Sequence, residues 1–108
     1  MLEIAIVKRD GKREAYSRAK MTSGLKKALE KRSYTDNQFH DLIQRLERDI
    51  RKKRSNEVTS QTLGEIVMKQ LKRFDKVAYI RFASVYYSFD DLDTFEQELK
   101  KLEKKRRS

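Results

Sequence analysis

The fold of this chain is decided near its start by the stretch EIAIVKRDGKREAY, residues 3–16. Its first half is rich in β-branched residues, Asp10-Gly11 follows, and a second extended run leads to Tyr16. An Asp-Gly pair between two such runs favours a tight turn, because glycine adopts a positive φ at little steric cost. Residues 3–16 are therefore predicted to form a β-hairpin.

Two helices are predicted directly after the hairpin. Ser17 offers an N-cap to a first helix that ends near Lys31, and Thr35 with Gln38 has the spacing of a capping box. The second helix should run to about residue 53 with one apolar stripe, and the pattern places Glu47 on its polar face. Residues 57–58 could add a short third strand.

The second half of the chain is predicted to be helical. Thr59 or Ser60 can cap a third helix that reaches residue 74. Asp75 starts a further helix whose residues 77–86 are apolar on nearly every side, which is typical of a helix in the middle of a bundle. A last amphipathic helix has a narrower stripe that favours contact with a partner or another subunit, formed by Leu92, Phe95, Leu99 and Leu102.

These elements predict one α+β domain, a bundle of about four to five helices capped by a small β-hairpin or three-stranded sheet. The domain is expected to span residues 1–103. The basic tail at residues 104–108 is expected to be disordered.

Composition narrows the functional classes. The chain has 108 residues, of which 41% are charged, and a net charge of +10. Such an excess favours polyanionic partners, nucleotides or nucleic acid, although a highly charged solvated surface is the alternative. The chain has no cysteine and one histidine, His40 in a polar setting, so no metal site is expected. No apolar run approaches the ~20 residues that span a membrane, and no signal peptide is visible, so a cytoplasmic location is expected.

Catalysis has no support in the sequence. A Walker A loop ending at Gly11-Lys12 would need a glycine where Ile6 stands. There is no Ser/His/Asp set, no cysteine nucleophile and no paired-carboxylate cleft. We therefore expect a binding protein and not an enzyme.

Three cations surround the hairpin. Lys8 and Arg9 flank the turn, and Lys20 lies in the first turn of the following helix, where phosphates would also meet free helix N–H groups. The alternative is that Asp10-Gly11 only supplies the turn and the cations merely solvate the hairpin. The residues alone leave both interpretations open.

Two motifs carry a resemblance to a known family. The pattern IVKRDGxxExYSxxKM at residues 6–21 resembles the N-terminal signature of ATP-cone domains, which bind ATP or dATP as allosteric regulators. The run DKVAYIRFASVY at residues 75–86, preceded by VMxxL at residues 67–71, is similar to the ribonucleotide reductase repressors of the NrdR family. The resemblance covers residue 4 to about residue 102.

The resemblance implies a nucleotide sensor. ATP and dATP, with or without Mg²⁺, would occupy the same cone, and different occupancies would favour different homo-oligomers. In that family a zinc ribbon with two CxxC pairs precedes the cone and binds DNA. The abrupt start of the chain suggests an excised cone, so zinc and DNA are expected only at that missing ribbon.

Two other functions stay open. In the first, the chain is the regulatory ATP-cone of a ribonucleotide reductase itself. In the second, it is a basic helical module that binds nucleic acid directly through residues 44–54 and the tail.

Carried over by motif position, the resemblance implies that four residues bind the nucleotide phosphates: Lys8, Arg9, Lys20 and Thr59. Thr59 is also a good N-cap, so its presence has a purely structural explanation.

The resemblance implies that Glu14 and Ser17 lie near the base of the nucleotide, and that Val7 contributes through its backbone. Ser17 would cap a helix in any case, and Glu14 has the alternative of pairing with Arg13 or Lys12 across the hairpin.

Among the aromatic residues, Tyr86 is the expected nucleotide contact, with core packing as its alternative. Two residues depart from the family pattern: Tyr16 stands where Phe is common, and Tyr87 stands where Arg follows the Ser-Val-Tyr motif.

Overall fold

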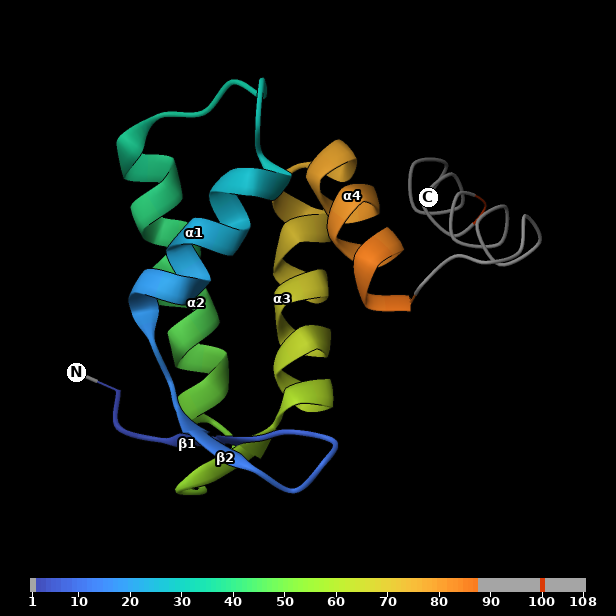
Figure 1. Cartoon of the computed structure of the whole chain (residues 1–108). Coiled ribbons are helices and arrows are strands. Elements are labelled where there is room, and N and C mark those ends of the chain that lie inside the picture. Colours follow the sequence, from blue (N-terminus) through green and yellow to red (C-terminus); the bar gives the residue numbers. More distant parts are fainter. Residues whose placement is uncertain (1, 88–99, 101–108) are drawn as a thin grey trace.

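The computed structural model describes residues 2–87 and residue 100. A small sheet lies beneath a bundle of helices (Figure 1). Its strands are β1 (Ala5–Val7), β2 (Arg13–Ala15) and β3 (Glu57–Thr59), in the order β2-β1-β3. Strand β1 pairs antiparallel with β2 and parallel with β3. The predicted hairpin and the short third strand are both confirmed.

The Asp-Gly turn joins β1 to β2 in the expected way. Gly11 has a φ of +84°, and its N–H donates to the carbonyl of Lys8 at 2.9 Å. The Asp10 carboxylate accepts a hydrogen bond from the Lys12 N–H at 2.9 Å. The aspartate and the glycine therefore each have a distinct part in closing the turn.

The helices are α1 (Arg18–Ala28), α2 (Asp36–Arg51), α3 (Ser60–Phe74) and α4 (Lys76–Tyr87). Ser17, Thr35 and Thr59 cap the first three of them, and the capping box at the start of α2 is complete. Both α1 and α2 end two to three residues before the predicted limits. The chain enters left-handed backbone shortly after each helix, at Lys31 (φ 63°) and Arg54 (φ 52°), which stops the helical hydrogen bonding.

The core forms where α1, α2 and α3 meet. Leu42, Leu46 and Leu71 are fully buried there, as the apolar stripes predicted. Glu47 was placed on the polar face of α2, and this is wrong: only 2% of it is exposed. A helix face of this width includes the position one residue after Leu46, and hydrogen bonds from Tyr16 and Arg18 stabilise the buried carboxylate there.

The interpretation of α4 as a central helix is also wrong. It packs against α3 and α1 at the side of the bundle (Figure 1), burying Ala78 and Ala83 while Val85 is 81% exposed. Small residues allow close approach on one face, but an apolar composition does not say how many neighbours a helix has.

Polar contacts join α4 to the far end of α1. The Arg81 guanidinium donates to the carbonyl of Ala28, the last residue of α1, at 3.2 Å and to that of Glu30, which follows the helix, at 2.7 Å. Arg32 forms an ion pair with Asp75 at 2.9 Å, directly before α4. The predicted C-terminal helix with Leu92, Phe95, Leu99 and Leu102, and the tail at 104–108, lie outside the described residues.

Candidate nucleotide-binding site

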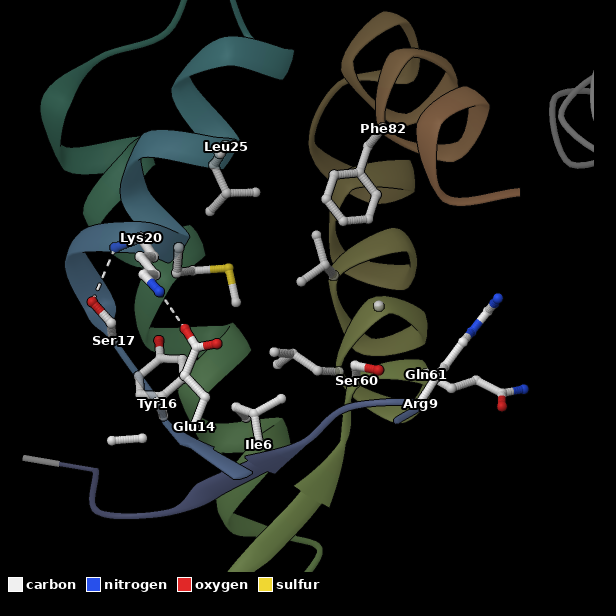
Figure 2. Close-up of a pocket in the computed structure, with 16 residues that line it drawn as sticks. Ile6, Arg9, Glu14, Tyr16, Ser17, Lys20, Leu25, Ser60, Gln61 and Phe82 are labelled. Carbon is white, nitrogen blue, oxygen red and sulfur yellow. Dashed lines mark hydrogen bonds and ion pairs between the residues drawn. The ribbon is translucent and has the colours of Figure 1, made fainter. Parts of the chain in front are cut away.

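A cavity of about 480 Å³ opens between the hairpin, α1, the start of α3 and α4 (Figure 2). Four of the residues predicted to bind nucleotide line it: Arg9, Glu14, Ser17 and Lys20. They come from the turn, from β2, from the α1 cap and from the first turn of α1. The structure therefore brings together residues whose proximity the sequence only implied.

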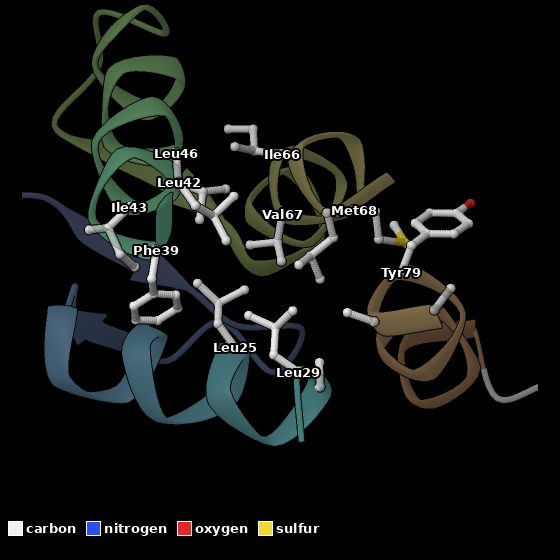
Figure 3. Close-up of a cluster of buried hydrophobic side chains, with 14 of the residues drawn as sticks. Leu25, Leu29, Phe39, Leu42, Ile43, Leu46, Ile66, Val67, Met68 and Tyr79 are labelled. Atoms are coloured by element: carbon white, nitrogen blue, oxygen red, sulfur yellow. The ribbon is translucent and has the colours of Figure 1, made fainter. Parts of the chain in front are cut away.

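The floor of the cavity is apolar. Met21 and Leu25 of α1, Leu63 and Val67 of α3, and Phe82 of α4 line it. The floor is continuous with the core, where Leu25 and Val67 also pack (Figure 3). Apolar walls with a few polar groups at the rim are typical of sites for small ligands with a flat aromatic part.

Glycine keeps two helices from filling this space. Gly24 of α1 and Gly64 of α3 both line the cavity, and a Cβ built at Gly24 meets nothing within 4 Å. These glycines and the floor were not predicted, because their helical spacing indicates an inward face without saying which part of that face stays uncovered. A glycine on the inward face of a predicted helix was the available signal.

The rim of the cavity is polar, and its cations, Lys20 and Arg9, come from different elements. Figure 2 shows Lys20 and Ser17 on the α1 side and Ser60 at the start of α3, while the side chains of Arg9 and Gln61 extend outward past α3. The first-turn amides of α3 lie at the positive end of that helix, which favours an anion. The rim is thus suited to phosphate and the floor to a base.

Glu14 forms ion pairs with two of the lysines that are predicted to bind the nucleotide phosphates. Its carboxylate contacts the Lys8 ammonium at 2.7 Å and also forms an ion pair with Lys20. The hydrogen bond from Lys20, followed by that from Lys8, lowers the pKa of Glu14 from 4.5 to about 2. The alternative pairing of Glu14 with Arg13 or Lys12 does not form: Glu14 pairs with Lys8 and Lys20, and Arg13 pairs with Glu57 at 2.6 Å.

The ion pairs of Glu14 make a first prediction. A pKa of about 2, below the ordinary 4.5, means that these pairs stabilise the fold above about pH 4.5 and lose that effect as the pH falls toward 2. Lys20→Ala should raise the pKa of Glu14 toward its ordinary value, and Arg13→Ala should not. Carboxyl NMR titration measures this, and a Glu14 that titrates near pH 4.5 in the unaltered chain would contradict the contacts.

Val7, Lys8 and Thr59 are not among the described residues that line the cavity. Val7 pairs with Arg13 and Thr59 in the sheet, and Lys8 reaches the site only through Glu14. The Thr59 hydroxyl accepts the Thr62 N–H at 3.1 Å as an N-cap. Tyr86 belongs to α4, but its side chain lies outside the described residues.

Across residues 2–87, no group of three or more His, Cys, Asp or Glu side chains is arranged to hold a metal ion. In the same part of the chain, no helix is long and apolar enough to cross a membrane.

Comparison with known proteins identifies the family. Residues 4–92 match the ATP cone domain. The chain is 46% identical over 101 residues to the transcriptional repressor NrdR of Desulforapulum autotrophicum. The aligned region covers 94% of this chain and 61% of that protein. It is 44% identical over 99 residues to NrdR of Petrotoga mobilis, covering 92% of this chain and 66% of the relative. NrdR of Geobacillus kaustophilus is 46% identical over 102 residues, 94% of this chain and 67% of the relative.

The chain thus spans about two thirds or less of the length of these relatives. The relatives are named repressors and the matched domain is regulatory, so this chain is not an enzyme. The matched domain, the α+β fold and the similarity over more than nine tenths of the chain agree: this protein belongs to the ATP-cone family, as a domain of the NrdR transcriptional repressors.

Proposed function

We propose that this chain senses adenine nucleotides for a repressor of ribonucleotide reductase genes, and that ATP or dATP binds in the cavity between the hairpin, α1 and α3. One observation carries the proposal: an apolar floor and a cationic rim face the same cavity of about 480 Å³. The base would lie on the floor against Phe82, and the phosphates would lie between Lys20 and Arg9.

Glu14 would change partners when nucleotide binds. Lys8 and Lys20 contact its carboxylate in the absence of ligand. A triphosphate carries more negative charge than one carboxylate, so it would attract both ammonium groups. The released Glu14 could accept a hydrogen bond from a ribose hydroxyl or from the base, which fits its expected place near the base.

Mg²⁺ would enter with the nucleotide and not be held by the protein. Glu14 is the one carboxylate among the described residues that line the cavity, and both of its oxygens contact lysine. The phosphates would then supply the ligands that Mg²⁺ prefers.

NMR tests the location directly. Titration of ¹⁵N-labelled protein with ATP should shift the amides of Ser17, Lys20 and Gly24 most, while those on the outward face of α2 should move little. Largest shifts on that face, at residues 48–54, would favour the second candidate function given below.

The proposed signal is a change of assembly. Nucleotides can select an oligomer only if they bind one assembly better than another. The DNA-binding zinc ribbon is proposed to belong to the part of the relatives that this chain does not span. Such a repressor would act in the cytoplasm.

Nucleotide is therefore expected to change self-association of the chain. Val85 is 81% exposed on α4, and the apolar residues predicted as a C-terminal stripe would add to this contact. Bound phosphates would also reduce the repulsion from the net charge of +10. Sedimentation velocity without ligand, with ATP and with dATP measures this, with added salt at matched ionic strength as the control. One unchanged peak in all three samples would contradict the switch.

A second candidate function is direct nucleic-acid binding. Arg48, Arg51 and residues 52–54 are basic and exposed, and none of them has an ion-pair partner among residues 2–87. Such a surface binds phosphate backbones without sequence preference and loses affinity steeply with salt. If this second function holds, gel shifts without nucleotide should show tight binding to DNA of any sequence that weakens steeply with salt. We expect only weak binding in that experiment.

A further inference from the structure

Glu47 is a buried carboxylate outside the cavity, and its partners all lie at the junction of β2 and α1. It accepts a hydrogen bond from the Tyr16 hydroxyl at 2.8 Å and one from Arg18 Nε at 2.9 Å, both on Oε2. The second guanidinium nitrogen of Arg18 contacts Oε1. Only 3% of the Glu47 side chain is exposed, so it has little contact with water.

The two partners of Glu47, Tyr16 and Arg18, flank the cavity residue Ser17 in the sequence. Tyr16 and Ser17 line the cavity, and Arg18 begins α1. None of the described lining residues comes from α2, which carries Glu47. One carboxylate thus ties the segment that positions Ser17 and Lys20 to a helix that does not touch the ligand space.

The chemistry of the cluster favours a fixed geometry. A buried carboxylate is stable only when its oxygens are paired, and here three donors reach it. Hydrogen bonding by Arg18 lowers the pKa of Glu47, while burial and the bond to Glu47 raise the pKa of Tyr16. At neutral pH the carboxylate is therefore charged and the phenol keeps the proton that it donates.

We infer that Glu47 is a positioning residue for the nucleotide site, which holds the segment 16–20 in the geometry that binds phosphate. This inference rests on the proposed function. A segment that is ordered before the ligand arrives loses less conformational entropy on binding, which increases affinity.

The test compares two carboxylates that each pair with an arginine. Glu47→Gln keeps the shape and removes the charge. Asp75→Asn is the matched control, because Asp75 is 11% exposed and pairs with Arg32 at 2.9 Å, yet neither residue lines the cavity. Asparagine also keeps the ability to cap α4. Both variants should unfold at lower temperature than the unaltered chain.

Only Glu47→Gln should weaken ATP binding, by about 5- to 10-fold, when calorimetry is done well below the unfolding temperature of both variants. Tyr16→Phe keeps the ring in the cavity and removes one donor, so it should show a smaller loss of about 2-fold. Equal ATP affinity in Glu47→Gln and the unaltered chain would overturn the inference and leave Glu47 a purely structural residue.

Amide hydrogen exchange separates this inference from the proposed function. The Met21 N–H donates to the Ser17 carbonyl at 3.0 Å and reports on the first turn of α1. Its exchange should be faster in Glu47→Gln than in Asp75→Asn without any nucleotide present. If neither the unaltered chain nor any variant binds ATP, the proposed function fails. Equal Met21 exchange in Glu47→Gln and Asp75→Asn would overturn the positioning role independently.

Discussion

Gly24→Leu is expected to weaken nucleotide binding more than any other single substitution considered, while the domain stays folded. A Cβ at Gly24 meets nothing within 4 Å, so the leucine side chain would extend into the cavity without disturbing the backbone. It would exclude the base from the floor, and losing about 100 Å² of apolar contact weakens binding by roughly 100-fold. Isothermal calorimetry with ATP measures the loss, and circular dichroism verifies the fold.

Two variants control for effects on the helix. Gly24→Ala should retain binding and stabilise the free domain by about 0.5–1 kcal/mol, because alanine is the better helix former. Ser23→Leu places the same side chain on the neighbouring position, which does not line the cavity. If Ser23→Leu lost as much affinity as Gly24→Leu, occlusion of the cavity would not be the cause.

Loss of the rim cations should have the second largest effect. Lys8→Ala, Arg9→Ala and Lys20→Ala are each expected to weaken ATP binding by about 1.5–3 kcal/mol, the scale of a hydrogen bond to a charged group. Folding should survive, because these side chains are exposed and the turn closes through backbone bonds and Asp10. Calorimetry and thermal unfolding of each variant measure both quantities.

The three variants should also differ from one another. Arg9 lines the cavity directly, whereas Lys8 contacts the site only through Glu14. Arg9→Ala and Lys20→Ala should therefore lose more affinity than Lys8→Ala. If all three left affinity unchanged and lowered the unfolding temperature, the cations would serve only to stabilise the hairpin.

Local signals in the sequence predicted the framework of the fold. Asp10-Gly11 specified the turn, and Ser17, Thr35 and Thr59 specified three helix starts, because each acts on backbone within four residues of itself. Positions that depend on tertiary packing were harder. The place of α4 at the side of the bundle follows from which neighbours it meets, and its composition does not contain that information.

The candidate site was predicted at its rim and missed at its floor. A family motif indicated that Arg9, Glu14 and Lys20 lie near one another, because they are close in sequence around one turn. The floor depends on which inward residues remain uncovered once the helices pack. Glu47 was misplaced for a related reason: its partners Tyr16 and Arg18 are about 30 residues away, and only the folded chain brings them together.

The most direct test of this account is isothermal calorimetry of the unaltered chain with ATP and with dATP, with Gly24→Leu measured under the same conditions. We predict saturable heat with both nucleotides and roughly 100-fold weaker binding by Gly24→Leu. An absence of heat with either nucleotide, or equal binding by Gly24→Leu, would contradict the claim that this domain senses adenine nucleotides through the cavity between the hairpin, α1 and α3.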